Sequence, residues 1–304
     1  RRGADIPASM YGIFFEEINH AGDGGLYAEL IQNRGFEDSS VPEGYTVKED
    51  RIFPPTDRAN HLTGARPHPD LSFRWNPDPI PAWRFEQLEG SGASAELTRE
   101  YPLNEASPTA LKVTLPEKGR ISLSNCGFWG MNIEKGKGYY LRMNTSNGNR
   151  FEGRAILKLV AEDGTELCNR PLAIDPDRTW CEYTGQLTAT GSDPHARFVI
   201  ELEGTGTLLL DYVSLFPETF RNRINGLRND IAQTLEALHP AFVRWPGGCI
   251  VEGIDLSNRI EWKKTIGDPK NRPGIYDTWG YRATMGFGYH EFLEPPACSS
   301  AMRE

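Results

Sequence analysis

The alternation of apolar and polar residues over residues 81–217 most limits the folds open to this chain. Leu111, Val113 and Leu115, for example, are separated by a lysine and a threonine, and turn-forming runs such as Glu162–Gly164 follow the alternating segments. Short half-buried strands with regular turns are typical of an antiparallel β-sandwich. No helix-like window interrupts the pattern, so we predict an antiparallel β-sandwich of the jelly-roll kind here.

A different pattern precedes this region. An apolar run, Tyr11–Phe15, ends in the adjacent carboxylates Glu16 and Glu17, and a glycine-rich polar turn follows. After that turn, residues 26–32 have the composition of a helix. A strand that ends in charged residues and a glycine-rich loop is how a βα unit of an α/β barrel begins, and the functional groups of such barrels lie at the carboxyl ends of strands.

A second strand end of the same character follows the alternating region. Apolar residues recur at helical spacing over Leu227–Leu238, and proline at position 240 is expected to end that helix. A short apolar strand, Ala241–Val243, then leads into Arg244, Trp245 and a Pro-Gly-Gly turn. Two strand ends that carry charged, aromatic and glycine residues favour a functional site over a chance surface feature.

The two motifs, YGIFFEEINHAGDGGLYAELIQNRGFE and RWPGGCIVEG, resemble the signature regions of the family 51 glycoside hydrolases, the α-L-arabinofuranosidases. The resemblance covers roughly Met10–Glu37 and Phe216–Glu294. It implies a (β/α)8 barrel that hydrolyses terminal α-L-arabinofuranosyl residues of arabinose-containing plant polysaccharides with retention of configuration. The intervening region resembles the carbohydrate-binding-module sandwich that some members insert after the first barrel strand.

These observations together predict a multi-domain chain of the α/β plus all-β class. Residues 1–80 would form the first barrel strand, its loop and a linker, because residues 38–80 are rich in proline and lack a sustained period. Residues 81–217 would form the inserted sandwich. Residues 218–304 would continue the barrel with a helix, a second strand and a long loop, and Tyr289–Glu294 would begin a further helix before the Pro295–Pro296 tail.

The resemblance also implies roles for particular residues. Glu16 would accept hydrogen bonds from arabinose hydroxyls, since a carboxylate offers two acceptor oxygens. Arg244 would orient substrate or catalytic carboxylates by charge-assisted hydrogen bonds. Cys249 would lie near the sugar, and Trp279 could stack on the leaving group. Each has a structural alternative: a solvated strand end for Glu16, an ion pair for Arg244, a buried thiol for Cys249 and loop packing for Trp279.

Aromatic residues of the sandwich are candidates for stacking on sugar rings. Trp129, beside Phe128 and flanked by glycines, is the first of these, and Tyr139 and Tyr140 are weaker ones. A sandwich core also needs aromatic residues, so each has a packing alternative. His20 lies in the glycine-rich turn and could touch substrate, but a lone histidine does not make a metal site, and we expect no metal and no cofactor.

Retaining glycosidases need two carboxyl groups about 5 Å apart. Glu16 and Glu17 are adjacent along a strand and point to opposite faces, so they cannot form that pair. In the family the acid/base and the nucleophile lie on later strands, and we expect both beyond the end of this chain, which would then be incomplete and inactive alone. The alternatives are a non-catalytic carbohydrate-binding protein and a non-functional fragment.

Composition excludes several other functions. The formal net charge of −9 argues against a nucleic-acid partner, which requires a basic surface. No apolar run approaches the roughly 18 residues of a membrane span. The five cysteines lack the paired spacing of zinc or redox motifs. The resemblance favours an extracellular or periplasmic location, although no signal segment is visible at the start, and it leaves open whether the full-length form is a homo-oligomer.

Overall fold

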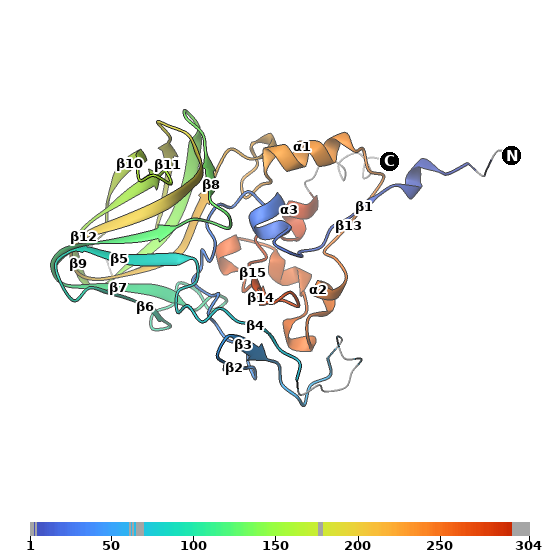
Figure 1. The fold of residues 1–304 in the computed structure, drawn as a ribbon, viewed down its shortest axis with the longest axis horizontal. Helices are drawn as coiled ribbons and strands as arrows, with labels where there is room; N and C mark the ends of the chain where they lie inside the picture. Colours follow the sequence, from blue (N-terminus) through green and yellow to red (C-terminus); the bar gives the residue numbers. More distant parts are fainter. Residues whose placement is uncertain are drawn as a thin grey trace. The chain divides into compact units, whose positions relative to one another are not determined.

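The computed structural model describes residues 3, 5–60, 62, 64, 70–175 and 179–293 of the 304-residue chain (Figure 1). Glu294 and the Pro295–Pro296 tail therefore lie outside the described residues. The chain divides into two compact units. The first unit comprises Arg1–Ala28, Pro42–Trp75 and Thr219–Glu304, and the second comprises Glu29–Val41 and Asn76–Glu218. Residues 29–41, which we expected with the barrel strand and linker, pack in the second unit.

The second unit is an eight-stranded antiparallel sheet in the order β10-β9-β12-β7-β5, with β11 paired to β9, β6 to β7 and β8 to β12. Its strands are β5 (Trp83–Glu89), β6 (Ser94–Thr98), β7 (Ala110–Asn125), β8 (Met131–Ile133), β9 (Gly138–Val160), β10 (Glu166–Ala173), β11 (Cys181–Thr188) and β12 (Asp193–Phe216). The alternation seen in the sequence thus corresponds to real strands.

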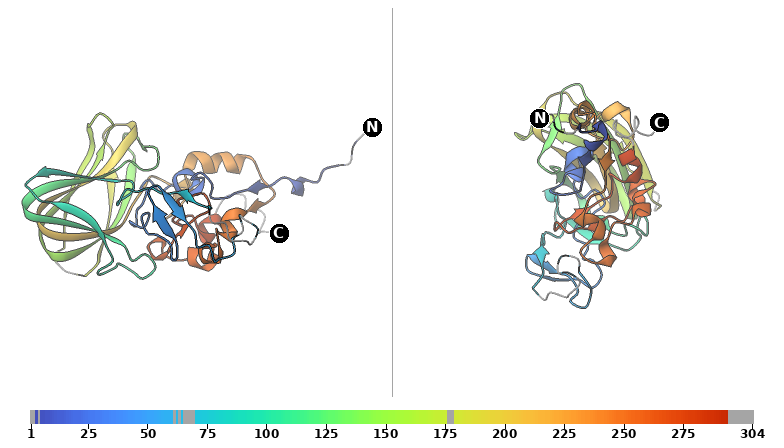
Figure 2. Two further views of the ribbon diagram at one scale, coloured as in Figure 1. Left: turned by 60° about the horizontal axis from the view of Figure 1, so that its bottom comes forward. Right: turned by 90° about the vertical axis from the view of Figure 1, so that its right-hand side faces the viewer.

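Three long strands, β7, β9 and β12, organise this unit. One end of β9 pairs with β11 and the other with β10, while β7 pairs with β6 at one end and with β5 at the other. Strands β9 and β12 approach each other closely at glycines: a Cβ on Gly204 would lie 2.2 Å from the Glu152 carbonyl oxygen. Figure 2 shows the strands curving around a common interior. That interior holds the apolar members of the alternation, including Leu111, Val113 and Leu115.

The segment that joins Tyr27 to this unit is extended rather than helical, so the predicted helix at residues 26–32 is wrong. Its backbone groups bond to other segments: Ala28 N–H donates to Gly226 O within the first unit, and Leu30 N–H donates to Leu215 O within the second. A helix would have needed these donors for carbonyls four residues back. The helical turn that does form nearby is a π-type turn, Gly22–Leu26, in the glycine-rich loop.

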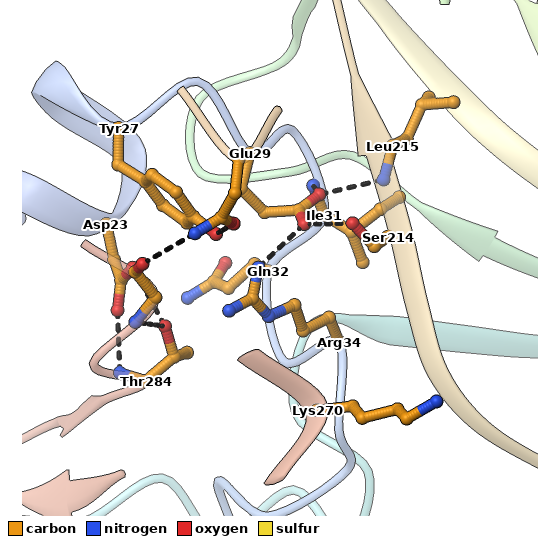
Figure 3. Close-up of polar contacts among 12 residues, drawn as sticks. Asp23, Tyr27, Glu29, Ile31, Gln32, Arg34, Ser214, Leu215, Lys270 and Thr284 are labelled. Carbon is orange, nitrogen blue, oxygen red and sulfur yellow. Dashed lines mark hydrogen bonds and ion pairs between the residues drawn. The ribbon is translucent and has the colours of Figure 1, made fainter. Parts of the chain in front are cut away.

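Glu29 explains why this extended segment is held in the second unit. Its buried carboxylate pairs with Arg34 (N···O 2.9 Å) and accepts hydrogen bonds from Ser214 Oγ (2.5 Å) and from the N–H groups of Leu215 (2.8 Å) and Ile31 (3.0 Å), as Figure 3 shows. Burying a charge is costly unless it is paired and hydrogen-bonded. These partners therefore fix the extended segment that carries Glu29 in the second unit.

The first unit contains a parallel pair of strands, β1 (Ile13–Phe14) and β13 (Val243–Arg244). The helix α1 (Asn229–Ala237) precedes β13, in agreement with the predicted helix over Leu227–Leu238, and α2 (Cys249–Glu252) follows it. A hairpin of β14 (Ile275–Tyr276) and β15 (Arg282–Ala283) and the helix α3 (Tyr289–Leu293) come next. Short 3₁₀ turns occupy Ala8–Met10, Phe220–Asn222, Leu256–Asn258, Trp262–Thr265 and Pro269–Asn271.

Residues 38–80 are not wholly irregular, as we had expected them to be. They contain a three-stranded antiparallel sheet of β2 (Thr46–Lys48), β3 (Arg51–Phe53) and β4 (Phe73–Arg74). Ile52 and nearby aromatic residues form a small core with Ile254 and Tyr276 of the same unit. Strands of two or three residues are too short to show alternation in a sequence. Among the described residues, no helix is long and apolar enough to cross a membrane.

The Glu29–Arg34 pair gives a stability prediction. Glu29→Ala leaves Arg34 buried without its carboxylate and removes the acceptor of three hydrogen bonds. Breaking a buried ion pair by removing one partner costs about 3–5 kcal/mol. We expect a loss of that size in the free energy of unfolding, measured by urea denaturation.

The matched control is Glu96→Ala, which removes the partner of the exposed Lys112 (N···O 2.9 Å). An exposed pair is worth at most about 1 kcal/mol. Equal losses in the two variants would contradict the role assigned to Glu29.

Candidate active site

The pairing of β1 with β13 brings together two strand ends that are far apart in the sequence. Ile13 lies opposite Val243 and Phe14 opposite Arg244, and Phe15 N–H donates to Arg244 O (2.9 Å). The strands are parallel, so their carboxyl ends lie at the same edge. Glu16 therefore adjoins the turn that follows Arg244.

Glu16 is held by that turn. Its Oε1 accepts a hydrogen bond from Ile250 N–H (3.1 Å), at the start of α2. Gly247 packs against the side chain so closely that a Cβ there would lie 2.4 Å from Glu16 Cγ. Cys249, the first residue of α2, has an exposed side chain and so does not fit the buried-thiol alternative. The structure thus brings Glu16 and Cys249 to one place.

The Arg244 side chain contacts residues at the ends of β1 and β13. Its guanidinium lies 4.7 Å from the centroid of the Phe14 ring, and its Nη2 donates to Gly247 O (3.3 Å). The side chain is exposed at the edge of the parallel pair. Trp279 lies in a separate turn, where its backbone N–H donates to Asp277 Oδ1 (2.8 Å). Trp279 is 36% exposed.

Glu17 faces a buried polar cluster instead. Tyr281 Oη donates to Glu17 Oε1 (3.1 Å), and Asp23 N–H donates to Glu17 Oε2 (3.0 Å). The Asp23 carboxylate accepts hydrogen bonds from Thr284 N–H (2.7 Å) and Thr284 Oγ1 (2.9 Å), as Figure 3 shows. Glu17 therefore joins the glycine-rich turn to the β14–β15 hairpin.

Burial perturbs the acids of this cluster. Desolvation, reinforced by the negative charge of Asp23, raises the pKa of Glu17 to about 8. Desolvation also raises the pKa of Asp277 to about 8, against the hydrogen bonds that its carboxylate accepts from the backbone of Trp279 and Tyr281. The pKa of the Tyr281 hydroxyl is raised by burial and by the neighbouring Glu17 and Asp277. Burial therefore favours the protonated forms of Glu17 and Asp277.

His20 belongs to the same cluster. Its ring stacks on Tyr281 with centroids 4.0 Å apart, and its backbone N–H donates to Tyr281 Oη (3.0 Å). Burial lowers the pKa of the imidazole. Among the described residues, no group of three or more His, Cys, Asp or Glu side chains could hold a metal ion.

A small pocket, open to solvent, lies beside Glu17. Glu17 and Asp23 supply its polar wall, and aromatic and aliphatic residues supply the rest: Phe15, Trp245, Pro246, Ile260, Ala283, Met285 and Phe287. Phe15 and Glu17, which follow β1 closely, line this pocket, and Glu16 does not.

The aromatic candidates of the second unit differ in exposure. Trp129 is 64% exposed and its ring centroid lies 5.8 Å from that of Phe128. Tyr140 is also exposed. Tyr139 is buried, and its hydroxyl accepts a hydrogen bond from Glu134 N–H (2.8 Å), so it is a packing residue rather than a stacking platform.

The sequence did not predict one polar cluster of the site. Its members are Glu17, Asp23, Asp277, Tyr281 and Thr284. Glu17 and Asp23 were visible in the first motif, but their partners lie about 260 residues further along the chain. The one available signal was the segment DTWGY, in which Asp277 is followed by residues suited to a tight turn. Nothing in its spacing indicates that it meets Glu17.

Comparisons with known proteins relate this chain to α-L-arabinofuranosidases. A family model described as an α-L-arabinofuranosidase 1 domain matches residues 234–299. In the solved structure of an arabinose-bound MgGH51 α-L-arabinofuranosidase, 42% of the chain superposes on 95% of this chain with a TM-score of 0.75 and 30% identity. These matches are to glycoside hydrolases.

Comparison with individual curated proteins names particular enzymes. The chain is 33% identical to the extracellular exo-α-L-arabinofuranosidase of Streptomyces chartreusis and 32% identical to α-L-arabinofuranosidase 1 of Arabidopsis thaliana, in each case over 96% of this chain. It is therefore related to the α-L-arabinofuranosidases over nearly its whole length, and the resemblance carried by the two motifs is confirmed. The chain spans 31% and 39% of the lengths of these two relatives.

The contact between Gly247 and Glu16 gives a prediction. Gly247→Ala places a methyl group against the Glu16 side chain and puts alanine at a φ of +140°. We expect it to destabilise the chain by several kcal/mol, beyond the roughly 1–3 kcal/mol typical of backbone strain alone. Urea denaturation measures the loss.

Gly267→Ala is the matched control for that variant. Gly267 also has a positive φ, +87°, but nothing lies within 4 Å of the position that its new methyl group would take. It should lose only the strain contribution. Equal losses would show that Gly247 does not position Glu16.

The raised pKa of Glu17 predicts a pH dependence. The folded state holds a proton up to about pH 8, whereas the unfolded state releases it near 4.5. Stability from this group is therefore complete below about pH 4.5 and is lost as the pH rises to about 8. The free energy of opening at Asp23 N–H, measured by hydrogen exchange, should fall over that interval.

Glu17→Gln removes the titrating group and keeps a hydrogen-bonding side chain, so the fall should become shallower. Glu252→Gln, which removes an exposed carboxylate of the same unit, should leave the slope as in the parent chain. An unchanged slope in Glu17→Gln would refute the assignment.

Proposed function

We propose that the protein to which this chain contributes is a retaining α-L-arabinofuranosidase that removes terminal α-L-arabinofuranosyl residues from arabinose-containing plant polysaccharides. The observation that carries the proposal is the placement of Glu16 at the carboxyl end of β1, held by Ile250 N–H beside the end of β13. The names of the relatives support the same activity.

The proposal includes the architecture. The parallel pair β1 and β13, with α1 directly before β13, would be the first strands of a (β/α)8 barrel, whose functional groups lie at the carboxyl ends of strands. The second unit would be a jelly-roll sandwich inserted into that barrel. In terms of domains, residues 1–80 and 218–304 supply the barrel and 81–217 the insertion, with residues 29–41 packed in the same unit as the insertion.

Within this scheme Glu16 accepts hydrogen bonds from vicinal arabinose hydroxyls, because each carboxylate oxygen is an acceptor. Arg244, exposed at the adjacent strand end, would orient substrate or a catalytic carboxylate. Cys249 would line the sugar site beside Glu16, and Trp279 would contact the leaving group. The acid/base and nucleophile would lie outside this chain, because Glu16 and Glu17 are adjacent beyond the end of β1, would point to opposite sides and so could not form the pair.

One observation favours a second function, carbohydrate binding without catalysis. The Trp129 ring is largely exposed and rests beside Phe128 in the turn between β7 and β8. An exposed indole of this kind suits the apolar face of a sugar ring. The second unit could bind polysaccharide through Trp129 whether or not the first unit takes part in hydrolysis.

Hydrolysis of an aryl α-L-arabinofuranoside tests the main proposal. The 304-residue chain should show no turnover, and a version extended by the polypeptide that its relatives carry beyond the matched region should be active. In the extended protein, Glu16→Gln should lower kcat/KM by roughly 10- to 100-fold, the value of a hydrogen bond to a charged group. Glu252→Gln, an exposed change on α2, should leave kcat/KM unaltered.

Turnover by the 304-residue chain would overturn the placement of the catalytic pair. Full activity in extended Glu16→Gln would overturn the role of Glu16. An inactive extended protein that still binds polysaccharide, with binding lost in Trp129→Ala, would favour the non-catalytic function instead.

A further inference from the structure

Tyr101, in the loop between β6 and β7, is the most exposed of the aromatic residues (Phe, Trp and Tyr) in the part of the chain that the structure describes. The residue is 77% exposed, against 64% for Trp129. Its backbone has a φ of +60°, in the left-handed region. Bulky residues rarely adopt that conformation, because the side chain crowds the backbone. The chain therefore carries backbone strain at a residue whose ring contributes little to the core.

The conformation of this loop is held by specific contacts within the second unit. Trp180 Nε1 donates to the Tyr101 carbonyl oxygen (3.1 Å). On the side toward β6, Arg99 Nη2 donates to Ser40 Oγ (3.3 Å), and Glu100 N–H donates to Thr98 Oγ1 (3.1 Å). The indole fixes the backbone and leaves the tyrosine ring in solvent. The exposed Tyr101 ring is thus attached to a backbone that hydrogen bonds keep in place.

The surroundings of the ring limit what could bind it. Arg99, Glu100 and Glu105 are exposed and charged. A single ring among charges does not form the extended apolar patch that a protein or membrane partner requires. A sugar ring fits better, since its C–H face can lie on the phenol while its hydroxyls remain hydrated or bond to polar groups of the loop.

We propose that Tyr101, with Arg99 and Glu100, forms a polysaccharide-binding site in which the tyrosine ring stacks on a sugar of the polymer. The site is distinct from Trp129, which lies in the turn between β7 and β8. It rests on the proposed function only for the choice of polymers: arabinoxylan, arabinan and arabinogalactan. Among the described non-glycine residues with a positive φ, Tyr101 is the aromatic residue with the greatest exposure, and functional positions often hold such strain.

Tyr101→Asn is the sharpest test. Asparagine tolerates the left-handed conformation and lacks the ring, so the substitution relieves strain and removes the platform together. Affinity electrophoresis of the 304-residue chain through gels that contain each polymer measures binding. We expect binding about two- to tenfold weaker than in the parent chain, as stacking energies imply, with an unchanged or higher midpoint of thermal unfolding.

Two further variants separate the ring from its support. Tyr101→Phe keeps the ring and should retain binding. Trp180→Phe removes the indole N–H that holds the Tyr101 carbonyl and should weaken binding less than Tyr101→Asn does.

A lower unfolding midpoint in Tyr101→Asn would show a structural role and overturn the proposal, as would undiminished binding in that variant. Absence of retardation of the parent chain by all three polymers would also overturn it. Hydrolysis of the aryl arabinofuranoside by the extended protein reports on the proposed function separately, so the two can fail independently.

Discussion

The first unit depends on the parallel pairing of β1 with β13. Each strand is only two residues long, and the two are separated by about 230 residues of sequence. Two-stranded pairs are marginal in water, so this one needs support from its neighbours. That support comes from Phe15, Trp245, Phe287 and Phe292, whose rings pack together on one face. Because this packing fixes the pair, it also fixes the strand ends that carry Glu16 and Arg244.

The two carboxylates at the end of β1 show how strand alternation separates functions. Glu16 remains partly exposed and is held by a single backbone N–H of α2. Glu17 turns to the opposite face, where burial favours its protonated form and a tyrosine and a backbone N–H hold it. A one-residue slip of β1 would exchange these environments. The partly buried contacts of Glu17 with the glycine-rich turn and the β14–β15 hairpin therefore also specify the register that presents Glu16.

Sequence alone predicted the elements whose signals are local and repeated. The alternation across Leu111, Val113 and Leu115 reappears in β7, and the helical period before Pro240 reappears in α1. Predictions were wrong where the partners of the backbone lie far away. The apolar spacing of residues 26–32 resembles a helix, yet Leu30 and its neighbours bond to distant carbonyls and the segment is extended. The β2–β4 sheet was missed because its strands are shorter than one full alternation.

The residues of the candidate site likewise differ in whether a local sequence signal reveals them. Glu16, Arg244 and Cys249 could be singled out because each lies in a motif whose order of residues is distinctive. The Glu17–Tyr281 contact could not, because a tyrosine in a turn gives no indication of which carboxylate it meets. Tyr101 is a third kind of case. Its significance comes from exposure and a positive φ, neither of which the sequence displays, and no neighbouring glycine or asparagine announces the left-handed turn. Residues whose conformation conflicts with their own local preference are thus found only once the backbone is known.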